Sequence, residues 1–111
     1  MPWLVHEDKV LATVEVADSV GGRARGLLGR DGIEGAILLT PARSVHTFRM
    51  RFAIDVAYLD RDHTVLRVVT MAPNRIGMPV WRARSVIEAE AGSFERWGLH
   101  AGDPVEIRGT P

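Results

Sequence analysis

Apolar and polar residues alternate along much of this chain, and the alternation predicts short β-strands. In residues 9–16 every second position is valine or alanine, and the positions between them are more polar. Because neighbouring side chains of a strand point to opposite faces, this pattern predicts a strand with one buried face. Residues 36–39 are all apolar, which predicts a strand buried on both faces.

The same alternation predicts a β-hairpin between about residues 53 and 71. Residues 52–59 and 64–71 both alternate, and residues 60–63 join them with Asp-Arg-Asp-His, a run that favours a turn bonded to its own backbone. Further strands are predicted at residues 45–48, 83–90 and 104–108. Residues 1–8 either pair with a sheet edge or remain loose.

Two short helices are predicted between these strands. The first begins at an N-cap provided by Asp18 or Ser19 and ends near Leu28, although its three internal glycines each cost up to ~1 kcal/mol relative to alanine. The second is a single turn over residues 94–97, with Ser93 as its N-cap and a glycine after it. Residues 72–82 contain two prolines and a glycine and form a long irregular connection, which is typical of functional or mobile loops.

These elements predict one domain over residues 1–111, of the α+β class and mostly β. The expected architecture is a small, mostly antiparallel, β-barrel-like sheet with one or two short helices, because no strand–helix–strand alternation is present. Closing the sheet would protect the edges of so many short strands.

Composition narrows the possible functions. The 14 basic and 14 acidic residues give a formal net charge of zero, which argues against sequence-independent nucleic-acid binding. The chain has no cysteine, so disulfides, thiol catalysis and thiolate metal sites are excluded. No signal peptide is visible, and no apolar run approaches the ~18 residues that a membrane span needs. We therefore expect a cytoplasmic protein, and no cofactor is predicted.

Several motifs together resemble a known family. They are Arg25-Gly26-Leu27-Leu28, Phe48-x-Met50, Ile54-Asp55-Val56-x-Tyr58-Leu59-Asp60, Val86-Ile87-Glu88 and Gly98-Leu99-x-x-Gly102-Asp103-x-Val105. In this order and spacing they are similar to the domain of unknown function 192 family, over about residues 10–107. The resemblance implies a small β-rich α+β domain and implies no activity, because none is established for that family. This chain departs from the family pattern at Leu28, at Arg51-Phe52 after the methionine, and at Ala53.

The densest mixture of charged, aromatic and apolar residues lies at residues 45–60, and it suggests a binding site. A pocket between residues 45–55 of this stretch and residues 72–82 would take a small polar or anionic ligand, because arginine binds anionic groups through a planar fork of donors. The predicted ligand-binding residues are His46, Arg49, Arg51, Asp55 and Trp81. The preferred function is a non-enzymatic binding module for such a ligand or for a protein partner.

Other interpretations remain open. Asp55 interrupts an apolar strand and needs a partner if it is buried, for which Arg25, Arg49 and Arg51 are available. Glu88 has the same need, with Arg25 as a suitable partner.

A hydrolase-like enzyme would instead pair His46 with Asp55 and draw its nucleophile from Ser44, Thr47 or Ser85, although no strained nucleophile motif is present. No metal site is predicted, because the histidines and acids lack a recognised ligand spacing.

Overall fold

The computed structural model of this chain describes residues 2–18 and 32–109. The strands in this part of the chain are β1 (Trp3–His6), β2 (Lys9–Ala17), β3 (Ala36–Leu39), β4 (Ile54–Leu59), β5 (Val65–Met71), β6 (Ser85–Glu90) and β7 (Glu106–Arg108). The described helix is α2 (Ser93–Trp97). The helix predicted from residue 18 or 19 to residue 28 lies outside the described residues.

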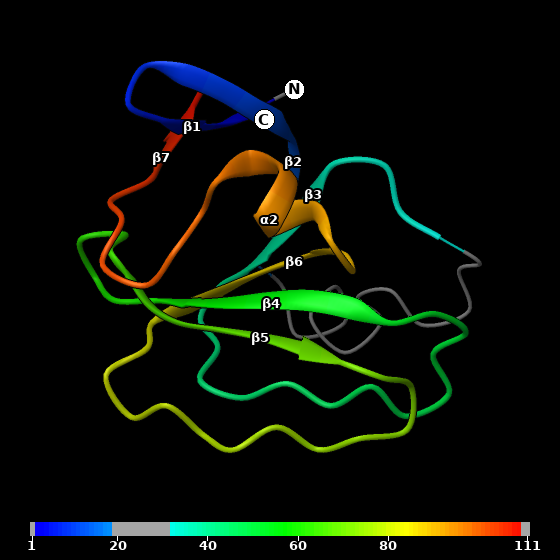
Figure 1. The fold of residues 1–111 in the computed structure, drawn as a ribbon. Coiled ribbons are helices and arrows are strands. Elements are labelled where there is room, and N and C mark those ends of the chain that lie inside the picture. Colours follow the sequence, from blue (N-terminus) through cyan, green and yellow to red (C-terminus); the bar gives the residue numbers. More distant parts are fainter. Residues whose placement is uncertain (1, 19–31, 110–111) are drawn as a thin grey trace.

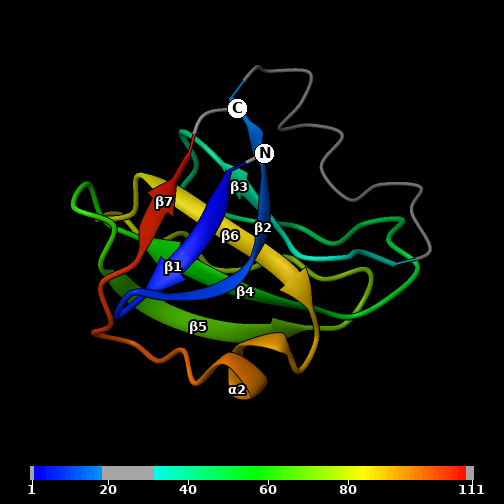
Figure 2. The ribbon, with the colours of Figure 1, turned by 90° about the horizontal axis from the view of Figure 1, so that it is seen from above.

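The strands form one sheet in the order β5-β4-β6-β3-β2-β1-β7. Only β2 and β3 pair in parallel, and the other neighbours are antiparallel. Figures 1 and 2 show that the sheet coils, so that β1 and β7 cross over one face of β4 and β6. The prediction of a mostly antiparallel, β-rich domain with a short helix is therefore confirmed.

The predicted closure into a barrel is wrong, because the sheet is open. β5 and β7 stand at the two ends of the strand order. They approach each other only before β7 begins, where an isolated bridge pairs Thr64 with Pro104 and the Val65 amide donates to the Asp103 carbonyl at 2.8 Å. Proline has no N–H to donate and β7 has only three residues, so the bridge does not extend into a ladder.

The predicted hairpin is confirmed as β4 and β5. Its turn is held by Asp60, whose Oδ1 accepts hydrogen bonds from the amides of Asp62 and Thr64 at 2.8 and 2.9 Å. These bonds favour the ionised carboxylate, and the Thr64 bond is the main reason that the pKa of Asp60 is lowered. The turn therefore fixes the pairing register of the strands that carry the candidate site.

Residues 45–48 do not form a ladder strand. Only His46 makes a bridge there, with Ile76. Residues 3–6, for which pairing was left open, form β1 between β2 and β7. Ser93 is the first residue of α2 rather than its N-cap, which is Gly92 and carries no side chain.

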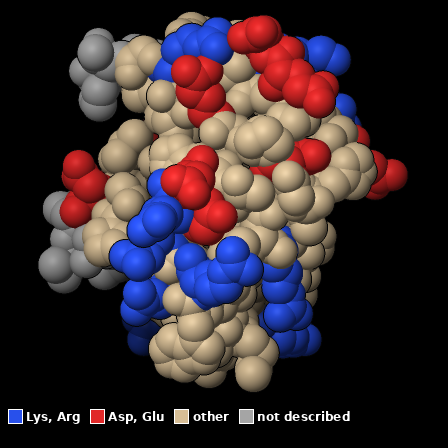
Figure 3. Space-filling model, turned by 90° about the vertical axis from the view of Figure 1, so that its left-hand side faces the viewer, with Lys and Arg blue, Asp and Glu red and all other residues tan. Residues whose placement is uncertain are grey.

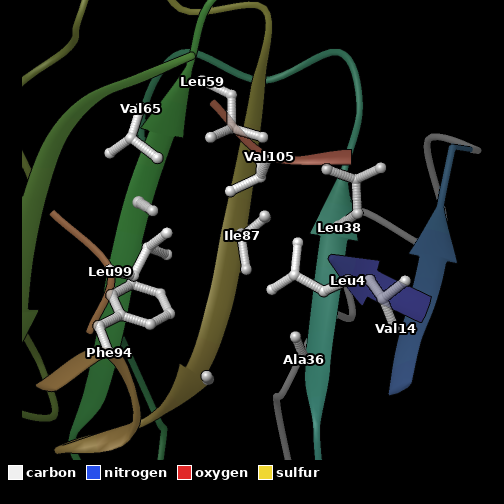
Figure 4. Packing of buried hydrophobic residues seen from close by; sticks show 12 residues of the cluster. Leu4, Val14, Ala36, Leu38, Leu59, Val65, Ile87, Phe94, Leu99 and Val105 are labelled. Carbon is white, nitrogen blue, oxygen red and sulfur yellow. The ribbon is translucent and has the colours of Figure 1, made fainter. Parts of the chain in front are cut away.

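Two hydrophobic cores pack on opposite faces of β4 and β6, which explains why both strands are buried on both faces. The inner core lies between the two halves of the coiled sheet, beneath α2 (Figure 4). Its labelled side chains are Leu4, Val14, Ala36, Leu38, Leu59, Val65, Ile87, Phe94, Leu99 and Val105. The outer core includes Val45, Met50 and Ala83 from the loops, so those loops are anchored to the outer face of the sheet.

Candidate functional site

Two loops that are distant in sequence pair with each other below the sheet in the view of Figure 1. Residues 43–50 run beside residues 74–81, and we call these two segments the ribbon. The Thr47 amide donates to the Arg75 carbonyl at 2.8 Å, the Gly77 amide to the Val45 carbonyl at 2.8 Å, and the Val80 amide to Arg43 at 2.9 Å. These hydrogen bonds give a defined backbone path to residues 72–82, which the sequence predicts to be an irregular connection.

Thr47 is the polar centre of the ribbon and is completely buried. Its hydroxyl donates to the Ala72 carbonyl at 2.6 Å and accepts from the Arg75 amide at 2.8 Å. The Asn74 amide donates to the Thr47 carbonyl at 2.7 Å. One threonine therefore holds the start of the 72–82 connection against the preceding loop, and the hydrolase interpretation loses one of its three candidate nucleophiles to this structural task.

A pocket of about 440 Å³ lies between the edge strand β5 and the ribbon. Its lining residues are Tyr58, Arg67, Val69, Thr70, Met71, Ala72, Arg75, Ile76, Gly77 and Met78. Two guanidinium groups and a phenol therefore share the pocket with apolar side chains that include Val69, Met71 and Ile76. None of the lining residues is acidic.

The phenol of Tyr58 lies where the sheet meets the ribbon. Burial raises the pKa of Tyr58, the positive charge of Arg67 opposes this shift, and Glu88 adds to it. A Cβ at Gly77 would lie 2.9 Å from the Tyr58 hydroxyl oxygen and 3.1 Å from the Val45 carbonyl. Glycine is therefore required for the ribbon to approach the sheet this closely.

Arg75 is oriented by its own loop. Its Nη1 donates to the carbonyls of Pro73 and Asn74 at 3.4 and 3.3 Å, which leaves other donors of the guanidinium for a ligand. Arg67 is exposed on β5 opposite Tyr58. The pocket thus presents positive charge from two elements.

Asp55 is almost completely buried, and it supports the structure behind the pocket. Its Oδ1 accepts from the hydroxyl of Thr70 at 2.7 Å, and its Oδ2 accepts from the amides of Gly92 and Phe94 at 3.0 and 3.1 Å. The amides at the start of a helix lack partners inside it. Asp55, which lies in β4, therefore caps the N-terminus of α2. The suggested partner Arg25 lies outside the described residues.

Glu88 is a second buried acid, 4% exposed, on the outer-core side of β6. Burial raises the pKa of Glu88 to about 7. Ser85 lies at the start of the same strand, and its buried hydroxyl has no hydrogen-bond partner among the described residues. Glu88 therefore changes charge near neutral pH without lining the pocket.

The structure brings some of the predicted site residues together. His46 and Arg49 lie on the ribbon, where His46 bridges to Ile76 and stacks on Phe48 with ring centroids 5.2 Å apart. The Arg49 amide donates to Asn74 Oδ1 at 3.0 Å. These residues border the pocket-lining segment, but they do not line the pocket themselves.

The other predicted residues are arranged differently. Trp81 is 76% exposed and does not cover the pocket, and Arg51 is also exposed. The carboxylate of Asp55 bonds to Thr70 and the start of α2, on the opposite face of the β4–β5 hairpin from Tyr58 and Arg67. The His46–Asp55 pair has no support in the hydrogen bonds described for Asp55, which run to a hydroxyl and two amides.

Sequence reasoning missed Arg67 and Arg75 as pocket residues. Arg67 carried a signal, because it interrupts the apolar alternation of residues 64–71 on the face that holds Val69. Arg75 carried none, since its position beside β5 depends on how the connection folds back. In the described part of the chain, histidine and acidic side chains form no group that could hold a metal ion.

Fold and pocket together define a small, mostly β domain with one open sheet and a basic pocket at its edge. The chain belongs to the DUF192 family, described as Uncharacterized ACR, whose model matches residues 4–107. It is 36% identical to a UPF0127 protein of Pyrococcus abyssi, over 96% of this chain and 97% of that protein. A UPF0127 protein of Pyrococcus horikoshii is 34% identical, over 93% of this chain and 96% of that protein.

Two solved structures resemble this fold. One, from Sinorhizobium meliloti 1021, is described as a candidate transcription regulator; its TM-score is 0.81 at 20% identity, covering 96% of this chain and 91% of that one. The other is a protein of unknown function from Novosphingobium aromaticivorans, with a TM-score of 0.78 at 21% identity, covering 95% and 83%. These likenesses concern the fold alone. No helix among the described residues is long and apolar enough to cross a bilayer.

Proposed function

We propose that this protein is a non-enzymatic binding module for a small anion that carries an apolar group. The observation that carries the proposal is the pocket beside β5, which Arg67 and Arg75 line together with apolar residues such as Val69 and Met71. Its volume of about 440 Å³ is within the usual range for small-molecule sites. Arginine pairs bind carboxylate and phosphate oxygens through charge-assisted hydrogen bonds.

The composition of the lining favours binding over proton transfer. The pocket contains no carboxylate or imidazole, which are the usual general acids and bases. Tyr58 provides a phenolic hydroxyl that can donate to a ligand oxygen. Asp55 supports the pocket wall from behind, because its hydrogen bond with Thr70 links β4 to β5.

The residues predicted from the sequence keep a role in the proposal. His46 and Arg49 would contact the part of a ligand that extends past the ribbon, and Arg51 and Trp81 would act only on a larger ligand. Asp55 would act by holding β5 against β4 rather than by contact with the ligand.

A thermal-shift screen tests the proposal, with phenyl phosphate, benzoate and adenosine monophosphate as anionic probes and phenol as the uncharged control. At least one anion should raise Tm, phenol should not, and the variant R67Q/R75Q should lose the shift. Each charge-assisted hydrogen bond contributes roughly 1.5–3 kcal/mol, so affinity should fall at least about tenfold. The matched control is Arg61→Gln, an exposed arginine in the β4–β5 turn. No shift with any anion, or an equal loss in both variants, refutes the proposal.

A further inference from the structure

The ribbon exposes large apolar side chains, and two of them, Phe48 and Trp81, do not line the pocket. Phe48 is 43% exposed, Ile76 and Met78 are each 72% exposed, and Trp81 is 76% exposed. Among the described residues, only Trp3 and Val10 are exposed hydrophobics of this kind elsewhere. Concentration of such side chains on two adjacent loops marks an interaction surface.

Basic and acidic residues are also unevenly distributed along the chain. Segments 41–53 and 65–84 contain seven arginines and no aspartate or glutamate. All seven arginines are exposed. The net charge of zero for the whole chain therefore combines basic segments, which include the ribbon, with an excess of acidic residues in the rest of the sequence.

Figure 3 shows how the two features combine in space. Basic side chains gather around an uncharged protrusion at the lower end of this face, and acidic side chains lie above them. Figure 1 shows that the lower end of the molecule is formed by the loops of residues 40–52 and 72–84. The loops that carry the exposed apolar side chains thus form an end of the molecule around which basic side chains gather.

We propose that the ribbon docks onto an anionic lipid surface. A convex, uncharged end that carries exposed apolar side chains suits a fluid interface, which deforms around it, whereas a protein partner would need a matching cavity. Tryptophan favours the membrane–water interface, and arginines around it would contact anionic headgroups. Single-stranded nucleic acid fits less well, because Ile76 and Met78 provide no ring on which a base can stack.

The orientation follows from the geometry. Phe48 and Trp81 enter the headgroup region, Arg82 and Arg84 contact lipid phosphates, and the acidic side chains above them in Figure 3 face the solvent. The key residues of this surface are Phe48, Trp81, Arg82 and Arg84. They differ from those of the proposed anion site, because none of the four lines the pocket beside β5.

Vesicle flotation tests this inference on the intact chain. Vesicles of mixed phosphatidylcholine and phosphatidylglycerol should bind the protein, and vesicles of phosphatidylcholine alone should bind it much more weakly. Neutralising Arg82 and Arg84 in R82Q/R84Q should weaken binding about fivefold for each charge removed. The control Lys9→Gln removes an exposed charge outside the basic segments and should leave binding unchanged.

A matched pair of variants tests the contribution of the apolar side chains to vesicle binding. The variant F48S/W81S should lose about tenfold or more in vesicle binding, while W3S/V10S, which removes exposed apolar side chains of β1 and β2, should not. Tryptophan emission should shift to shorter wavelength on anionic vesicles, and this shift should disappear in Trp81→Phe but persist in Trp3→Phe. Adding F48S/W81S to the R67Q/R75Q variant should reduce vesicle binding by the same factor as in the wild type. This result would separate the lipid-binding surface from the anion site.

Several results would overturn the inference. Absence of binding to the anionic vesicles is one, and equal binding to neutral vesicles is another. Equal losses in F48S/W81S and W3S/V10S would show that the apolar protrusion is not the contact. Poly-glutamate or single-stranded DNA that shifts the Trp81 emission more strongly than vesicles would assign the surface to another acidic partner.

Discussion

Replacing Asp55 distinguishes a structural carboxylate from a ligand-binding one. The change Asp55→Ala removes the acceptor of three hydrogen bonds, from Thr70 and from the amides of Gly92 and Phe94. The change Asp55→Asn keeps the shape and one acceptor oxygen. Its amide oxygen can still accept from the α2 amides, and its NH₂ group can donate to the rotatable Thr70 hydroxyl.

The expected magnitudes follow from this geometry. Hydrogen bonds to a charged group contribute roughly 1.5–3 kcal/mol each, and they are not additive at one carboxylate. Asp55 is only 3% exposed, so its donors lose their partner without water to replace it. We expect Asp55→Ala to lower the free energy of unfolding by about 3–4 kcal/mol, and Asp55→Asn to lower it by about 1–2 kcal/mol.

Urea unfolding followed by far-UV circular dichroism measures both values. A loss of about 3 kcal/mol corresponds to a fall in Tm on the order of 10–20 °C for a domain of this size. Thr70→Val tests the hydroxyl separately, and its effect should be smaller in the Asp55→Asn background than in the wild type. If Asp55→Ala lowered stability by less than about 1 kcal/mol while abolishing anion binding, Asp55 would be a ligand contact, and the structural assignment would be refuted.

The remaining predictions concern Glu88 and the ribbon. Burial raises the pKa of Glu88 from 4.5 to about 7, so the folded state holds its proton more tightly and stability falls as pH rises through that window. Glu88→Gln should remove this fall and gain up to roughly 3 kcal/mol above about pH 8, measured by urea unfolding across pH; a pH-independent difference from wild type would contradict this. Thr47→Val should lose about 2 kcal/mol and increase amide exchange at Arg75, and unchanged exchange would show that the ribbon does not depend on this hydroxyl. Gly77→Ala should destabilise by about 1–3 kcal/mol, because the new Cβ would meet the Tyr58 hydroxyl, whereas Gly32→Ala, with no atom within 4 Å of its Cβ, should have little effect.

The fold was predictable where the determining interactions are local. The β4–β5 hairpin follows from alternation and from the Asp60 turn, both of which can be read within about 20 residues of sequence. Strand β3, being apolar throughout, was correctly expected to be buried on both faces. The prediction of barrel closure was wrong because closure depends on how β5 and β7 meet. The alternation of apolar and polar residues carries no information on that contact.

The site was less predictable because its residues meet only in three dimensions. Asp55 was recognised as unusual, but its acceptor role depends on amides 37 and 39 residues away, which no sequence spacing reveals. The loops were rightly expected to lie near each other, although the pocket forms between one loop and the sheet edge. Arg67 could have been identified from its place in an alternating strand, whereas Arg75 could not.

The most direct test of the proposed anion site is a two-dimensional ¹H–¹⁵N NMR titration with phenyl phosphate. Binding in the pocket predicts the largest shift changes at the amides of Arg67, Thr70 and Gly77, and their loss in R67Q/R75Q but not in Arg61→Gln. Shift changes confined to other parts of the chain, or changes that persist unaltered in R67Q/R75Q, would contradict the assignment of this pocket as the ligand site.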